Sequence, residues 1–239
     1  MVHDRGIRMI IGHIGARKGS RGVLGKNMRP ICGRPLIDWS LDCLFDSDRI
    51  DHVVVSTDCE DIYAHGLARG TLPIGLRPDS LATDSAAKWE VWQHSLAAVE
   101  NLVGQFSIFL DLDCTCPLRI REDISAALEL FLSQSPDMVM SCCVARKNPY
   151  FNLVEHDETG ALKVSKELSH PVVARQQAPL VYEHVGSVYV ISPDYLRKAS
   201  GLFEGRVIPY VMPQERCVDI DSELDFKIAQ ILLRERIGT

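Results

Sequence analysis

A regular alternation of short apolar runs with longer amphipathic runs is the strongest constraint on the fold of this chain. The apolar runs at residues 9–14 and 52–56 are typical of strands that are buried on both faces. The segment at residues 35–45 has apolar residues at helical spacing and begins with a proline, which suits a first helical turn. Strands that alternate with helices in this way predict an α/β fold, with a doubly wound, mainly parallel sheet and helices on both faces.

The alternation continues to the end of the chain. It predicts further strands at residues 72–76, 108–112, 138–142, 187–191 and 207–212. It also predicts helices at residues 59–69 and 85–103, and helices that begin near residues 120, 193 and 222. A chain of 239 residues is long enough for one such domain, so we expect residues 1–239 to form a single unit.

One segment, residues 146–181, interrupts the alternation. It contains Asn-Pro and His-Pro pairs and the turn sequence Asp-Glu-Thr-Gly at residues 157–160. Short apolar runs on both sides of that turn predict a hairpin of residues 154–156 with residues 161–164. The segment has too few apolar residues for a core of its own, so we expect a small protruding excursion from the sheet.

A basic, glycine-rich loop at residues 15–27 lies between the first strand and the first helix. Open α/β sheets bind ligands at the carboxyl ends of their strands, and successive backbone N–H groups in such a loop can form an anion site. Arg17, Lys18, Arg21 and Lys26 add four positive charges. The loop has neither Walker A spacing nor the dinucleotide fingerprint. It predicts a polyphosphate site, although a surface turn or an RNA-contacting loop can have the same composition.

Composition narrows the class of protein. A net charge of −6 argues against nucleic-acid binding, and no run approaches the ~20 apolar residues of a membrane span. Residues 1–6 lack the apolar core of a signal peptide, so we expect a cytoplasmic protein. The eight cysteines lack the Cys-x-x-Cys spacing of zinc sites. Cys114 and Cys116 are expected to be small buried hydrophobes rather than nucleophiles, because the sequence places no histidine base beside them.

The loop resembles the opening of the CMP-sialic acid synthetases, the acylneuraminate cytidylyltransferases. The matching pattern is Ala-Arg-x-Gly-Ser-Arg-Gly-x-x-Gly-Lys-Asn at residues 16–27, followed by Gly-Arg-Pro-Leu-Ile at residues 33–37. The family usually has glycine where Lys18 stands and lysine where Arg21 stands. Further matching blocks, in the same order, cover nearly the whole chain.

The resemblance implies a binding site for CTP. The residues it implies are Ala16, Arg17, Ser20, Arg21, Lys26, Asn27, Arg77 and Asp84. Arg77 and Asp84 belong to the block Arg-Pro-x-x-Leu-Ala-x-Asp, in which Asp84 also fits a helix N-cap. Arg17 and Lys26 are catalytic candidates, because fixed cations stabilise a leaving pyrophosphate.

The resemblance also implies a sugar site, made by Asp113, Thr115, Arg175 and Gln176. These residues lie in blocks that match the family segments Thr-Ser-Pro-Leu-Arg and Arg-Gln-x-x-Pro. Many members carry glutamine where Asp113 stands, and asparagine where Val185 stands. Asp111 and Asp113 alternate along a strand and face the same side, where they could share a metal or bind a substrate hydroxyl.

The block Asp-Ile-Asp at residues 219–221 is the most specific match. It places Asp219 and Asp221 on one side of an extended segment. Mg²⁺ takes one or two protein carboxylates together with substrate phosphates, so both residues are predicted Mg²⁺ ligands and Asp219 a catalytic residue. Asp221 also fits the N-cap of the last helix.

Together these features predict a cytidylyltransferase, a nucleotidyltransferase of class EC 2.7.7. It would transfer CMP from CTP to the anomeric hydroxyl of a sialic-acid-like nonulosonic acid, a nine-carbon keto sugar acid, and release pyrophosphate. One alternative is an enzyme for the eight-carbon keto sugar Kdo, against which the Asp-Ile-Asp and Arg-Gln segments weigh. Another is a catalytically silent, regulatory sugar-nucleotide-binding protein, against which the retained basic and acidic candidates weigh.

In the resembled family, the segment that corresponds to residues 146–181 projects and makes dimer contacts. A hairpin of this size is marginal unless it packs on something, and a two-fold interface is the commonest solution. We therefore expect a homodimer, with Arg175 near a shared cleft where it pairs with the sugar carboxylate.

Overall fold

The structure, a computed structural model, describes residues 9–20, 22–83 and 85–238. The main strands are β1 (Ile10–Gly15), β4 (His52–Ser56), β5 (Ile108–Asp111), β6 (Met138–Val144), β9 (Tyr182–Ile191) and β10 (Val207–Val211). Two small hairpins are β2 (Pro30–Ile31) with β3 (Arg34–Pro35), and β7 (Val154–His156) with β8 (Leu162–Val164). The helices are α1 (Leu36–Phe45), α2 (Glu60–Ala68), α3 (Lys88–Val103), α4 (Arg121–Gln134), α5 (Pro193–Lys198) and α6 (Glu223–Ile237).

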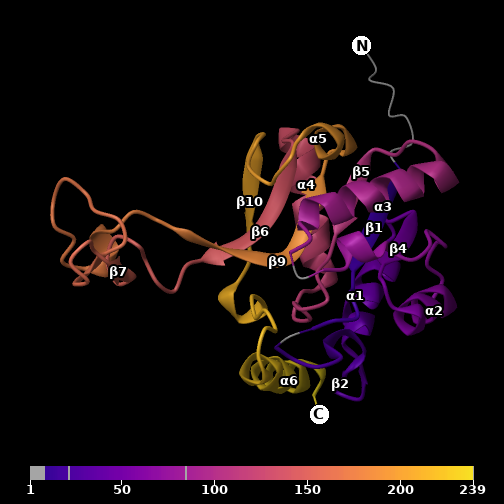
Figure 1. Ribbon diagram of the computed structural model, residues 1–239, viewed down its shortest axis with the longest axis horizontal. Helices are drawn as coiled ribbons and strands as arrows, with labels where there is room; N and C mark the ends of the chain where they lie inside the picture. Colours follow the sequence, from indigo (N-terminus) through magenta and orange to yellow (C-terminus); the bar gives the residue numbers. More distant parts are fainter. Residues whose placement is uncertain (1–8, 21, 84, 239) are drawn as a thin grey trace.

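The six main strands form one sheet in the order β10-β6-β9-β5-β1-β4 (Figure 1). Strand β9 runs antiparallel to its neighbours β5 and β6, and the other paired strands of this sheet are parallel. The predicted α/β fold with a mainly parallel sheet is confirmed.

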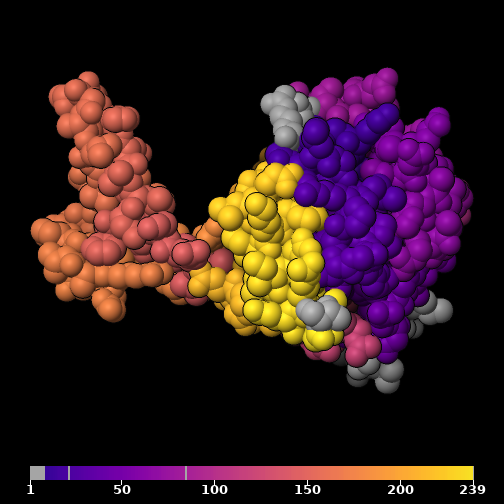
Figure 2. Space-filling view, turned by 90° about the horizontal axis from the view of Figure 1, so that it is seen from below, coloured from indigo at the N-terminus to yellow at the C-terminus, as the bar shows by residue number. Residues whose placement is uncertain are grey.

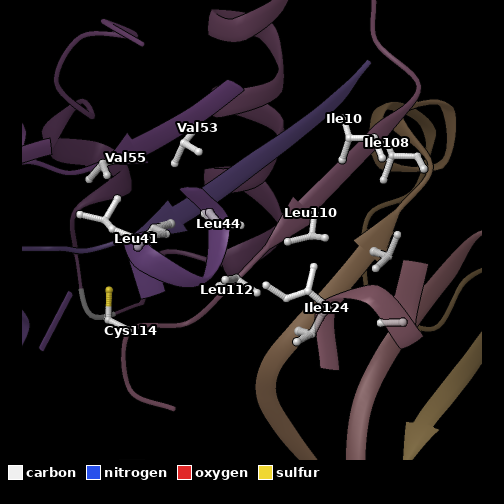
Figure 3. Close-up of a cluster of buried hydrophobic side chains, with 14 of the residues drawn as sticks. Ile10, Leu41, Leu44, Val53, Val55, Ile108, Leu110, Leu112, Cys114 and Ile124 are labelled. Carbon is white, nitrogen blue, oxygen red and sulfur yellow. The ribbon is translucent and has the colours of Figure 1, made fainter. Parts of the chain in front are cut away.

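Helices cover both faces of the sheet. On one face, Leu41 of α1 and Ile124 of α4 pack with Leu110 of β5 (Figure 3). On the other face, Trp92 of α3 packs with Phe109. Phe109 and Leu110 are consecutive, so their separation into two apolar clusters follows from the alternation of side chains along a strand. Each fully buried side chain of this size contributes about 1.5–3 kcal/mol.

Helix α6 closes a smaller core at the carboxyl ends of the strands. Phe226 and Leu233 of α6 pack with Ile31 and Leu36 near the glycine-rich loop. The N-cap of α6 is Ser222, whose hydroxyl oxygen accepts a hydrogen bond from the Asp225 amide at 3.3 Å. In Figure 2, α6 lies directly beside the N-terminal part of the chain. The last helix is thereby fixed beside the predicted phosphate loop.

Two sequence predictions need correction. Residues 72–76 do not form a strand: Pro73 has no N–H to donate, and Gly75 adopts a φ of 79°, which turns the chain. Helix α3 begins at Lys88 rather than at residue 85, with Ala87 at its N-cap. The predicted hairpin is confirmed as β7 and β8.

The segment between β6 and β9 leaves the body as a long arm (Figures 1 and 2). We use "arm" for residues 146–181. Pairing of Val144 with Tyr182 carries the antiparallel β6–β9 ladder to its base. Across the part of the chain that the structure describes, no helix is long and apolar enough to cross a membrane.

Candidate active site

A cavity of about 530 Å³ opens where β1 and β5 end. Its lining comes from the glycine-rich loop, from the segment that leads into α3, and from the chain just after β5. This is the edge of an open α/β sheet at which ligands bind. Of the predicted site residues, it brings together Arg17, Ser20, Lys26, Asn27, Arg77, Asp113, Thr115 and Asp221.

The glycine-rich loop packs against the segment that carries Asp219 and Asp221 and is hydrogen-bonded to it. Gly22 lies so close to this segment that an added Cβ would overlap the carbonyl oxygen of Asp221. The Lys26 ammonium donates to the carbonyl of Ile220 and lies 3.7 Å from the Asp221 carboxylate. The basic loop and the acidic segment therefore form one continuous structure around the cavity.

Some residues that were predicted to bind the nucleotide make hydrogen bonds within the protein. The Asn27 side-chain amide donates to the Arg17 carbonyl at 2.9 Å, and Asn27 is buried. The Ala16 side chain lies in the core, and its amide donates to the Ser56 carbonyl at 2.9 Å. These contacts shape the loop. Arg21 and Asp84, two further candidates, lie outside the described residues.

Arg77 lines the cavity but also anchors its wall. Its guanidinium donates to the Ser56 carbonyl at 2.7 Å and to the Ser56 hydroxyl at 3.2 Å. Burial lowers the pKa of Arg77 from its usual value. Arg77 therefore combines a structural role with its position at the cavity surface.

We use "cavity floor" for His13, Lys88, Ser95, Asp111 and Asp113. The sequence indicates the two aspartates but not the contacts that join these side chains. His13 Nδ1 lies 2.5 Å from Asp111 Oδ1, and His13 Nε2 lies 3.0 Å from the Ser95 hydroxyl. Burial lowers the pKa of His13 from its usual value, although Asp111 opposes this shift. The register explains the contact, because His13 and Asp111 are partners on β1 and β5.

Lys88, at the start of α3, links the two aspartates. Its ammonium lies 3.1 Å from Asp111 Oδ2 and 2.6 Å from both carboxylate oxygens of Asp113. Burial opposes ionisation of Asp111, but Lys88 and then His13 outweigh it and lower the Asp111 pKa to about 2. Burial, with repulsion from Asp111 and Asp219, raises the pKa of Asp113 to about 6, although Lys88 opposes this rise.

The acidic segment presents its two carboxylates differently. Asp219 Oδ1 is buried and has no hydrogen-bond partner among the residues that the structure describes. The Asp221 side chain is 82% exposed, since Ser222 rather than Asp221 caps α6. Within the described ranges, no group of three or more His, Cys, Asp or Glu side chains could hold a metal by itself.

The remaining candidates lie apart from the cavity floor or inside the protein. Arg175 and Gln176 are on the arm, in a short 3₁₀ turn (Arg175–Gln177), and both are exposed. The Arg175 guanidinium donates to the Ala145 carbonyl at 2.9 Å, at the base of the arm. Cys114 and Cys116 are fully buried; burial raises the pKa of Cys114 to about 12 and that of Cys116 well above its usual value.

A basic strand-to-helix loop that faces an acidic segment at the carboxyl ends of parallel strands defines an α/β protein of the nucleotidyltransferase class. Residues 11–209 match the family model described as "Cytidylyltransferase". The chain belongs to the cytidylyltransferase family and is a nucleotidyltransferase of the acylneuraminate cytidylyltransferase kind.

Two relatives are similar over nearly their full lengths. The sequence is 36% identical to "Post-translational flagellin modification protein B" of Campylobacter coli, over 95% of this chain and 96% of that protein. It is 36% identical to CMP-N,N'-diacetyllegionaminic acid synthase of Campylobacter jejuni, over 94% of each. The solved structure of CMP:2-keto-3-deoxy-manno-octonic acid synthetase complexed with CTP has a TM-score of 0.67. It matches 95% of this chain and 99% of its own at 16% identity, which shows the fold alone.

Proposed function

We propose that this protein transfers CMP from CTP to the anomeric hydroxyl of a nonulosonic acid and releases pyrophosphate. One observation carries the proposal: the basic loop, with Arg17 and Lys26, lines the same cavity as the Asp113–Thr115 segment and Asp221. The names of the relatives, one of them a CMP-N,N'-diacetyllegionaminic acid synthase, support this class of acceptor.

We assign the basic residues of the cavity to the phosphates, and the oxygen-bearing side chains to the sugar. Arg17 and Lys26, with the backbone N–H groups of the loop, bind the phosphates and stabilise the leaving pyrophosphate. Asp113 and Thr115 offer oxygen atoms for sugar hydroxyls. Catalysis then rests mainly on orientation of the two substrates and on stabilisation of developing charge.

Mg²⁺ fits the acidic segment. Asp219 supplies a buried carboxylate oxygen with no hydrogen-bond partner in the described part of the chain, and the Asp221 carboxylate is exposed nearby. Magnesium prefers oxygen ligands and usually keeps substrate phosphates and water in its shell, which agrees with a segment that offers so few carboxylates. When bound, the ion would neutralise charge on phosphate oxygens.

We further propose that the enzyme is a homodimer in which the arm of one copy reaches the sugar side of the other copy's cavity. The arm carries exposed apolar side chains, including Leu162 at 67%, Val173 at 76% and Leu180 at 64% exposure. Arg175 and Gln176 lie on the same arm. In this arrangement Arg175 pairs with the sugar carboxylate.

A pyrophosphate-release assay with CTP tests the function. The acceptors are N-acetylneuraminic, legionaminic and pseudaminic acids, with Kdo for comparison. We expect turnover with at least one nonulosonic acid. Faster turnover with Kdo would favour the eight-carbon acceptor, and binding of CTP without turnover of any acid would favour a silent binding protein.

A further inference from the structure

Lys88 and Asp113 form an ion pair in the lining of the cavity. We propose that Lys88 is a positioning residue that fixes the Asp113 carboxylate as an acceptor-only subsite for O–H or N–H groups of the sugar. Lys88 and Asp113 together would then determine which acid the cavity accepts. This inference rests on the proposed function, because it concerns the sugar side of the same cavity.

Lys88 lines the cavity and its side chain is 35% exposed, but its ammonium is engaged by groups of the protein. Its ammonium contacts Asp111 and both oxygens of Asp113. It also lies 4.2 Å from the centre of the Tyr189 ring and 5.0 Å from that of Trp92. An ammonium has three protons to donate, and these partners use its charge and its hydrogen-bonding capacity.

Asp113 is held from several sides. Its carboxylate lies against Gly186, where an added Cβ would overlap Oδ2. Its carbonyl accepts from the guanidinium of Arg119, a buried residue, and its amide donates to the Gly186 carbonyl at 3.2 Å. A carboxylate fixed in this way binds without further loss of side-chain freedom.

The fixed carboxylate still faces the cavity. The Asp113 side chain is 26% exposed, and the residue lies in the cavity lining. Each of its oxygens accepts from Lys88 at 2.6 Å, and a carboxylate oxygen has a second lone pair available for another donor. The pair therefore presents acceptor positions to the ligand.

The charge of the Lys88 ammonium affects whether the Asp113 carboxylate can bind a metal ion or a substrate hydroxyl. A divalent cation on Asp113 would lie next to the Lys88 charge, 2.6 Å from the same oxygens, and would be repelled. Hydroxyl and amide N–H groups have no such conflict. Between a metal and a substrate hydroxyl, the contacts of Asp113 favour the hydroxyl or another neutral donor.

The subsite differs in chemistry from glutamine, which many resembled proteins have at this position. A glutamine side chain both donates and accepts, whereas an ionised carboxylate only accepts. A buried acceptor discriminates strongly, because a ligand without a donor leaves it unpaired. We therefore expect this cavity to prefer acids with a hydroxyl or N-acyl N–H at the facing position.

The test compares Asp113→Gln, Lys88→Met and the double variant by pyrophosphate release with the three nonulosonic acids. Asp113→Gln leaves Lys88 paired with Asp111, so it should fold. For Asp113→Gln we expect the KM for the preferred acid to rise about 10- to 100-fold and the KM for CTP to change less than threefold. We also expect the order of preferred acids to change in this variant. Lys198→Met, on the surface of α5, is the matched control and should behave as wild type.

The double variant separates positioning from a general structural effect. Lys88 also pairs with Asp111, so its loss can lower stability and CTP turnover on its own. If Lys88 acts on the sugar through Asp113, the ratio of the sugar KM to the CTP KM should be no higher in the double variant than in Asp113→Gln alone. A higher ratio in the double variant, equal rises in both KM values, or an unchanged order of acids would overturn the inference. If wild type turns over no acid, the proposed function fails. Calorimetric binding of the same acids to wild type and Asp113→Gln then tests the subsite, and equal affinities would refute it.

Discussion

The arm and the cavity floor differ in how their side chains are surrounded: those of the floor are buried or half-buried and have partners, and most of those of the arm are exposed. On the floor, His13, Ser95 and Asp111 are completely buried and meet partners within the same chain. Along the arm, whose residues are all described, Asn148 is the sole buried residue, and apolar side chains such as Val173 are exposed. A region that satisfies itself can be complete in one chain, while an apolar region left in water indicates a missing partner. The comparison supports the proposal that the body carries the nucleotide chemistry and that the arm makes the contacts of the dimer.

The largest effect is expected when the proposed active site in the body is changed and the arm is left unchanged. We expect Asp219→Asn to lower kcat by about 100-fold or more, because it weakens a proposed Mg²⁺ ligand in a phosphoryl-transfer site. Circular dichroism and sedimentation should match wild type, and the Mg²⁺ dependence should weaken. Asp48→Asn, on the surface, is the control. Near-normal turnover of Asp219→Asn at low magnesium would remove Asp219 from the mechanism.

The reverse experiment disables the arm while the body stays intact. The double variant Val173→Asp/Leu180→Asp should sediment as a monomer and raise the sugar KM about tenfold, because charges on an apolar interface oppose association. Arg175→Ala should raise the sugar KM similarly, with little change in KM for CTP.

Leu102→Asp, a change at a half-exposed leucine of α3, is the control for the arm variant and should keep the wild-type assembly. A wild-type protein that is fully active as a monomer at assay concentration would refute the shared site. Equal effects of Arg175→Ala on the two KM values would refute its role toward the sugar carboxylate.

A smaller effect concerns the stability of the cavity floor. Burial lowers the pKa of His13 below 6.5, so below that pH the unfolded chain takes up a proton at His13 more readily than the folded protein does. The free energy of unfolding therefore falls as the pH drops through this range toward the folded pKa. His13→Asn cannot titrate and retains an N–H toward Asp111. Chemical denaturation at pH 7 and pH 5 should show a smaller loss in this variant; equal losses would contradict a lowered pKa of His13 in the folded protein.

The smallest expected effect is that of the buried thiols. Cys114→Ala/Cys116→Ala should keep activity within about tenfold, because burial raises both thiol pKa values and the reaction needs no covalent enzyme intermediate. Initial rates at saturating CTP check this. Complete loss of activity with a native circular dichroism spectrum would reverse the assignment.

The sequence predicts the architecture well where apolar periodicity is strong. Buried strands such as β4 and amphipathic helices such as α1 follow from local patterns. The direction of β9 does not, because periodicity carries no information on which way a strand runs. Nor does the irregular segment at residues 72–76, where Pro73 and the positive φ of Gly75 outweigh a short apolar run.

A contiguous motif predicts that Arg17 and Lys26 lie in one loop, and both line the cavity. The contacts of the cavity floor do not follow from the sequence, because they join residues far apart in the chain, such as Lys88 and Asp113. One signal was available: His13 is a polar residue inside an otherwise apolar strand. The register between β1 and β5 is needed to show that Asp111 lies opposite it.

The nucleotide preference of the enzyme tests the central claim most directly. Pyrophosphate release should be measured with CTP, UTP, ATP and GTP, each with the best nonulosonic acid and Mg²⁺. We expect CTP to give the highest kcat/KM, with chelation of Mg²⁺ abolishing turnover. Faster turnover with ATP, GTP or UTP, or release of pyrophosphate that does not depend on the sugar acid, would contradict the assignment of this protein as a cytidylyltransferase of nonulosonic acids.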